Sequence, residues 1–315
     1  MPLNLLAYEA IIPSLVLLAY AAVRLRVSVM REVLWAGFLG GIAAAFAATF
    51  WQQAVTWLVL AQRPDPLYSA LAHAFLVRAI PEEGLKFGLL VAMVLRVIHL
   101  ADARDTVFAS LGIALGFAAI GAATTAAGLS FGGFPISGPA AMLSMMSLTA
   151  EHGLCGLAMG ALVARVNDGP IVSGVRFLPA LLVPILLRAA YDFPLSVFAQ
   201  DPNIAWPPRA IPLLMVASLI IACTLLGSVV RRGKPDRREQ MRTRPRARRA
   251  ALFGILLIMG GLVFAVAGLG QYDRGMRDKL ALFCLVPMAL GVDLMMTAVA
   301  IVVARRPVVA REEAV

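Results

Sequence analysis

The chain has 315 residues, of which 61% are hydrophobic and only 15% are charged. Soluble domains are roughly 45–50% apolar and about 25% charged, so this composition argues against an ordinary soluble protein. The net charge of +10 would suggest nucleic-acid binding in a soluble chain. Here the basic residues lie in loops between apolar segments, as membrane proteins place them, and no nucleic-acid partner is expected.

Apolar segments of about 20 residues or more recur along the chain, and each is long enough to cross the hydrocarbon core as a helix. Alternating strand patterns of about ten residues are absent, which argues against a transmembrane barrel. The predicted spans are 3–23, 33–61, 67–98, 106–129, 139–164, 177–199, 209–230, 250–270 and 280–304. The sequence therefore predicts an all-α, polytopic transmembrane bundle of nine spans, forming one domain over residues 1–315.

Charge gives the predicted orientation. With the N-terminus outside, 20 basic residues fall in cytoplasmic loops and five in outside loops, which obeys the positive-inside rule. An odd number of spans then places the C-terminus in the cytoplasm. The most basic segment is the predicted cytoplasmic loop 231–249, which we interpret as a topology anchor; a site for anionic lipid is the alternative.

Ionisable side chains inside spans are costly and mark candidate functional sites. Three predicted spans carry such residues at a similar, central depth. They are Glu82, Glu83 and Lys86 in the third span, Glu151 and His152 in the fifth, and Arg188 and Asp192 in the sixth. Because scattered defects would not be expected to share a depth, we expect these residues to form one site.

The spacing in the third span favours acid–base chemistry. Lys86 follows Glu82 by four residues and Glu83 by three, and both separations bring side chains together on a helix. Lys86 can keep one carboxylate ionised while burial disfavours the charged form of the other, and such a pair suits acid–base catalysis. Pro81 is expected to kink this long span. A buried structural ion pair is the alternative, and it also explains Arg188 and Asp192, which are four residues apart.

The sequence resembles the PrsW family of bacterial intramembrane proteases, within the superfamily of CAAX proteases and bacteriocin-processing proteins. Glu82-Glu83-x-x-Lys86 is similar to the family's EExxK motif, and residues 115–120 resemble its second motif, in which a phenylalanine precedes a glutamate by four. His152 stands where the third motif carries a histidine. Residues 188–192 resemble the fourth motif, a histidine followed four residues later by Asn or Asp. The resemblance covers roughly residues 67–200 and implies a protease core there.

Two positions depart from the family pattern. The glutamate of the second motif would stand at Gly121, which has no side chain, and the histidine of the fourth motif is replaced by Arg188. Arginine neither ligates metals in ordinary proteins nor acts readily as a base. Glu151, beside His152, is a candidate replacement for the missing carboxylate.

The donor set favours a mechanism without a metal or other cofactor. HExxH is absent, and only one histidine lies at the central depth, whereas catalytic zinc sites are rich in histidine. The resemblance points to Glu82 as the base that activates water, supported by Glu83 and Lys86. His152, with Arg188 or Lys86, is then expected to stabilise the oxyanion. The opposite assignment of the two glutamates stays open.

The predicted function is intramembrane endopeptidase, acting in the bacterial cytoplasmic membrane on a membrane-anchored or membrane-proximal protein. The resemblance makes an anti-sigma factor one candidate substrate. Two alternatives remain: a degraded protease that binds a membrane partner without cutting it, and a proton-coupled carrier that uses the same buried acids.

Overall fold

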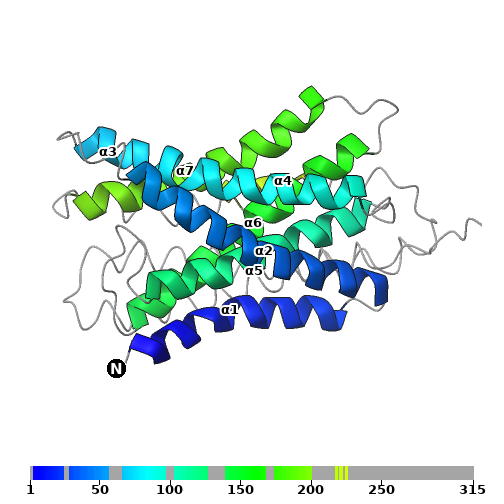
Figure 1. The fold of residues 1–315 in the computed structure, drawn as a ribbon, viewed down its shortest axis with the longest axis horizontal. Coiled ribbons are helices and arrows are strands. Elements are labelled where there is room, and N and C mark those ends of the chain that lie inside the picture. The colour runs from blue at the N-terminus through cyan, green and yellow to red at the C-terminus, as the bar shows by residue number, and fades with distance from the viewer. Residues whose placement is uncertain are drawn as a thin grey trace, which may run out of the picture.

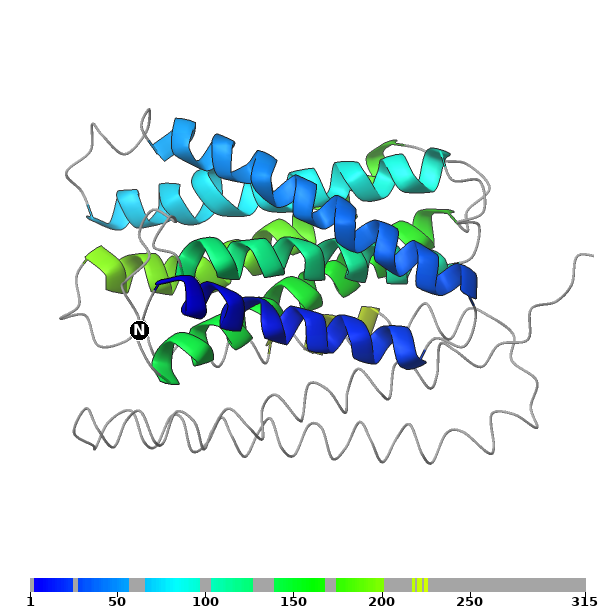
Figure 2. The same cartoon turned by 60° about the horizontal axis from the view of Figure 1, so that its bottom comes forward.

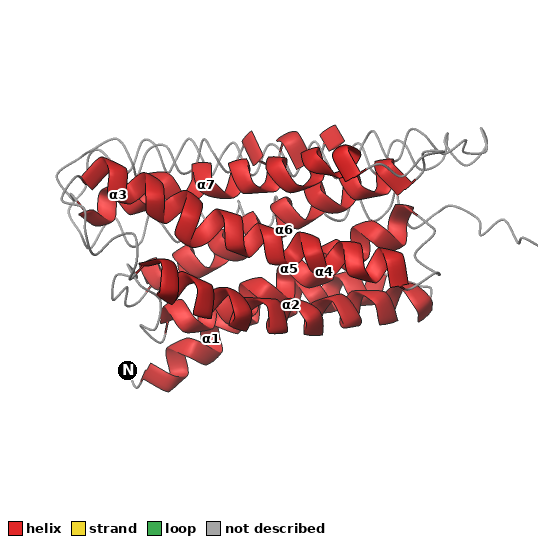
Figure 3. Ribbon diagram, turned by 45° about the horizontal axis from the view of Figure 1, so that its top comes forward, coloured by secondary structure: helices red, strands yellow, loops and turns green. Residues whose placement is uncertain are grey.

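The computed structural model describes residues 3–24, 28–56, 66–96, 103–126, 139–167, 174–200 and most of 217–225, and all secondary structure in this part of the chain is helical (Figure 3). The elements are α1 (Leu3–Arg24), α2 (Ser28–Val55), α3 (Pro66–Ala72), η2 (His73–Ala79), α4 (Ile80–Arg96), α5 (Ala103–Ala126), α6 (Pro139–Asn167), η3 (Gly174–Phe177) and α7 (Leu178–Gln200). The longer helices lie side by side in an elongated bundle (Figures 1 and 2).

Helix α5 is the centre of this bundle. In the most apolar 18-residue stretch of its segment Asp105–Thr124, 83% of the residues are buried, compared with 39% in the corresponding stretch of Arg31–Val55 of α2. A helix that is apolar on all sides is expected in the interior, and Leu111, Ile113 and Leu115 on successive sides of α5 are all buried. Helices α1, α2 and α6 pack around it, so the centre of the bundle is protein rather than lipid.

Small residues bring α2 and α5 into backbone contact. A Cβ atom at Gly41 of α2 would overlap the carbonyl oxygen of Ile113, and one at Gly116 of α5 would overlap that of Phe38. Such close approach is characteristic of membrane helices, where small residues allow dense packing without a hydrophobic driving force. The contact fixes α2 against the central helix independently of any polar side chain.

The predicted third span is one helical rod with an irregular middle. Helix α3 leads into a π-helical segment, η2, and then into α4, and the junction residues Ala72 and Ile80 both have right-handed helical dihedrals. Pro81 lacks an N–H and cannot donate to the carbonyl four residues back, which interrupts the regular ladder at this point. A π-helical segment therefore lies shortly before the glutamate pair, and the kink at Pro81 stays a prediction.

The helices match the first six predicted spans. Three of them, Arg31–Val55, Asp105–Thr124 and Val175–Val197, are long and apolar enough to cross a membrane, and Ile11–Val23 is a shorter apolar helix. The all-α class is confirmed for the described residues. The spans 250–270 and 280–304, most of 209–230 and the basic loop 231–249 lie outside them. The count of nine and the orientation therefore stay predictions.

Candidate active site

All seven predicted site residues are buried, and none is more than 4% exposed. They come from three elements: Glu82, Glu83 and Lys86 from α4, Glu151 and His152 from α6, and Arg188 and Asp192 from α7. Buried charges are tolerated only when they are paired and hydrogen-bonded. Six of the seven are joined in one network, Asp192 through ion pairs alone and the others through at least one hydrogen bond, whereas Glu151 lies apart.

Lys86 is the centre of the first half of the network. Its ammonium donates to Glu83 Oε1, one helical turn earlier, and lies 3.0 Å from His152 Nδ1. The ammonium also lies 4.7 Å from the centre of the Phe117 ring, which packs against His152 with ring centroids 5.2 Å apart. Phe117 thus supports both the cation and the imidazole from α5.

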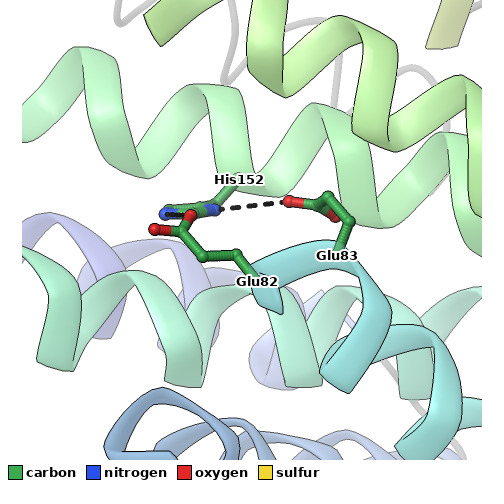
Figure 4. A group of neighbouring side chains, drawn as sticks. All are labelled: Glu82, Glu83 and His152. Carbon is green, nitrogen blue, oxygen red and sulfur yellow. Dashed lines mark ion pairs between the residues drawn. The ribbon is translucent and has the colours of Figure 1, made fainter. Parts of the chain in front are cut away.

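This arrangement favours one tautomer of His152. A lysine ammonium has only donors, so Nδ1 must accept, and a neutral imidazole then carries its proton on Nε2. Nε2 lies 3.9 Å from Glu82 Oε2, and Nδ1 lies 4.0 Å from Glu83 Oε1. Figure 4 shows the imidazole between the two carboxylates, with one nitrogen toward each. The two glutamates therefore each face a different nitrogen of one ring.

Arg188 is the centre of the second half of the network. Its Nε donates to Glu82 Oε2 at 3.0 Å, and its Nη2 lies 3.1 Å from Asp192 Oδ2. Arg78 of η2 also approaches Asp192, at 3.7 Å. The remaining terminal nitrogen of Arg188, Nη1, is buried and has no hydrogen-bond partner among the described residues. It therefore has an unused donor.

A small cavity of about 30 Å³ borders this network. A water needs roughly 10–15 Å³ by this measure, so the space is large enough for water. Glu82, His152 and Arg188 line the cavity, whereas Glu83 does not. The geometry thus distinguishes the two glutamates: Glu82 faces the space where a reacting group can bind, and Glu83 lies behind it with Lys86.

Gly121 lies in the wall of the same cavity. A Cβ atom built at this glycine would approach only His152 Nε2, at 4.0 Å. The missing carboxylate of the second motif would therefore have stood beside the imidazole, and its place is open here.

Glu151 is directed into a different cluster. Its Oε1 accepts from the Cys155 thiol at 3.5 Å and from the Ser218 hydroxyl at 3.4 Å. Neither Glu151 nor Cys155 lines the cavity. These contacts do not support the expectation that Glu151 replaces the absent carboxylate. Its side chain accepts hydrogen bonds from Cys155 and Ser218 instead of facing the cavity.

Two residues of this network were not identified from the sequence. Gln52 of α2 donates from Nε2 to Glu82 Oε1 at 2.8 Å, and Arg78 pairs with Asp192. Both line the cavity. The only sequence signal for Gln52 is an amide inside an apolar span, and nothing in the spacing connects it to a glutamate 30 residues away.

A comparison with protein-family models gives one match, to the PrsW family of intramembrane metalloproteases, over residues 30–223. The match covers more than half of the chain and every residue of the network. The chain belongs to the PrsW family. It is thus a membrane protein of a protease family, as the motifs predicted. No match was found among curated proteins or among solved structures.

Because the PrsW family is described as metalloproteases, the donor set must be tested for a metal. Glu82, Glu83 and His152 each place one ligand atom within 4.8 Å of the others, and three protein ligands are usual in catalytic zinc sites. However, Lys86 holds Glu83 Oε1 and His152 Nδ1, while Arg188 holds Glu82 Oε2.

A divalent ion on these atoms would have to displace the Lys86 ammonium and lie beside a buried guanidinium, where like charges repel strongly. In the tautomer that accepts from Lys86 at Nδ1, the other imidazole nitrogen, Nε2, carries the proton and has no lone pair for a metal. Glu83 Oε1, His152 Nδ1 and Glu82 Oε2, as arranged, do not fit a metal ion, and of the remaining atoms only Glu83 Oε2 is buried without a partner among the described residues.

Proposed function

We propose that this protein is an intramembrane endopeptidase that hydrolyses a membrane-anchored or membrane-proximal protein with a water activated by Glu82. The observation that carries the proposal is the cavity, because it brings a carboxylate, an imidazole N–H and a guanidinium to one space large enough for water. We assign the protease core to residues 67–200, to which α2 adds Gln52. The protein is expected in the bacterial cytoplasmic membrane as a multi-pass protein.

In the proposed reaction, Glu82 removes a proton from a water in the cavity, and the resulting hydroxide attacks the carbonyl carbon of the scissile peptide. Negative charge develops on the carbonyl oxygen. His152 Nε2–H and the unpartnered Nη1 of Arg188 are the donors available to stabilise it. Glu82 then returns its proton to the leaving nitrogen as the C–N bond breaks, which yields a carboxylic acid and an amine.

Glu83 and Lys86 do not contact the reacting groups directly and act through His152. Glu83 holds the Lys86 ammonium, and the ammonium holds His152 Nδ1 as an acceptor, so that the Nε2 proton points away from them. This assignment makes Glu82 the base and Glu83 the orienting group. It also gives Lys86 the role of fixing the tautomer of His152. A side chain without a hydrogen-bond donor could not do this.

The proposal is tested by Glu82→Gln, which removes the base and keeps the size of the side chain. General bases contribute typically about 10²–10⁴-fold in rate, so the appearance of fragments should slow by that factor. The assay is cleavage in proteoliposomes of a panel of single-span substrates that includes an anti-sigma factor. Glu32→Gln is the matched control, because Glu32 is exposed on α2.

Wild-type cleavage that Glu82→Gln leaves unchanged would contradict the assignment of the base. If the wild-type protein gives no fragments while a relative cleaves the same panel, the protease function itself is wrong. Co-purification of an intact single-span partner would then identify the non-cleaving alternative.

A further inference from the structure

Gln52 lies near the C-terminal end of α2, in a helix that the motifs of the family resemblance do not include. Its side chain is half-buried, and it lines the cavity beside Ala48 and Thr49 of the same helix. The adjacent Gln53 is exposed. Because successive residues of a helix are about 100° apart, one amide of this pair faces the site and the other faces outward.

The contact of Gln52 with Glu82 requires one orientation of the Gln52 amide. A carboxylate accepts hydrogen bonds and cannot donate, so the NH₂ end of Gln52 must point toward it. Gln52 Nε2 donates to Oε1 at 2.8 Å, while Arg188 Nε donates to Oε2 at 3.0 Å. The two donors come from different helices and hold different oxygens, so together they determine the rotation of the carboxylate plane.

Gln52 is not required to hold α2 in place. Backbone contact at Gly41 and Gly116 fixes α2 against α5, and Ala44, Ala45 and Ala48 pack on Phe117. Trp51 separately donates from its indole Nε1 to the Leu76 carbonyl at 3.2 Å, which connects α2 with η2. The Gln52–Glu82 hydrogen bond therefore contributes more to the orientation of the Glu82 carboxylate than to the attachment of α2 to the bundle.

We propose that Gln52 is a positioning residue that orients the Glu82 carboxylate toward the cavity water through its hydrogen bond to Oε1. Without this donor, the carboxylate can turn about its last side-chain bond while Arg188 alone retains it. A reacting group that is misplaced by about 1 Å can lose on the order of 10²-fold in rate. This inference rests on the proposed function, since it gives Gln52 a role in the same reaction.

Gln52→Leu removes the donor at similar size, and Gln53→Leu is the matched control. In the proteoliposome cleavage assay, we expect Gln52→Leu to lower kcat by about 10- to 100-fold and to leave KM within about twofold. Gln53→Leu should behave as wild type. Gln52→Asn, which keeps the amide on a shorter side chain, should have an intermediate kcat. Unfolding temperatures in detergent should be the same for the three variants.

The proposal is overturned if Gln52→Leu cleaves as fast as Gln53→Leu, or if its loss of activity follows KM or the folded fraction. If Gln52→Leu does not fold, Gln52→Asn decides the matter, and a wild-type kcat in that variant overturns the proposal. Failure of the proposed function is distinguishable, because the wild-type protein would then give no fragments, or Glu82→Gln would cleave as fast as wild type, whatever Gln52→Leu does.

Discussion

Arg188 is the residue whose replacement best separates a working site from a degraded one. In the structure it bridges two buried carboxylates, with contacts of 3.0 Å to Glu82 and 3.1 Å to Asp192. Arg188→His restores the residue of the family motif but provides a shorter side chain, which cannot reproduce both contacts. Removing one partner of a buried charge pair costs about 3–5 kcal/mol, because the remaining charge stays buried without compensation. Arg78 lies 3.7 Å from Asp192 and offsets part of this cost there.

We therefore expect Arg188→His to unfold at a lower temperature than the wild-type protein and to cleave more slowly. Hydrogen bonds to charged groups contribute about 1.5–3 kcal/mol, and loss of the one to Glu82 corresponds to roughly a 10- to 100-fold fall in cleavage rate. The assays are thermal unfolding in detergent and fragment appearance in proteoliposomes. Arg31→His, at an exposed position of α2, is the control. Faster cleavage by Arg188→His than by wild type would refute this reasoning and would mark Arg188 as a defect in the site.

Two further predictions concern metal content and helix packing. Because Lys86 and Arg188 hold the candidate ligand atoms, elemental analysis should find well under one zinc per purified chain, and chelators should not slow cleavage; about one tightly bound zinc per chain would overturn the metal-free assignment. Gly116→Ala should lower the unfolding temperature, since a new Cβ would overlap the Phe38 carbonyl and overpacking costs about 1–3 kcal/mol. Gly88→Ala, whose Cβ would meet no side chain and no other helix within 4 Å among the described residues, should be neutral or stabilising, and equal effects at both glycines would contradict the packing argument.

The polar residues of the site were predictable because a membrane makes them conspicuous. An unpaired charge at the centre of a bilayer is expensive, so Glu82, His152 and Arg188 stand out in apolar spans, and their common depth indicated that they meet. The structure brings the predicted residues together except Glu151, whose position beside His152 in sequence places it on a different side of α6. Neighbours in a helix diverge by about 100°, and depth alone does not specify the direction of a side chain.

Gln52 was missed because an amide costs far less than a charge in an apolar span, and its partner is distant in sequence. The open place beside Gly121 is a similar case, since the sequence shows only that a side chain is lacking there. That the space borders His152 and the cavity follows from how α5 and α6 pack. The roles of the two glutamates also depended on packing, because the spacing to Lys86 suits both.

The sequence by itself determined that the chain is helical and membrane-embedded and that a buried acid–base cluster lies within it, because hydropathy, length and the cost of buried charge are local properties of each segment. Tertiary structure alone decided that Glu82 faces the cavity and Glu83 faces Lys86, that Arg188 bridges Glu82 and Asp192, and that Gln52 donates to Glu82. The physical reason is that hydrogen bonds act over about 3 Å. Which atoms come within that distance is set by the packing of helices far apart in the chain.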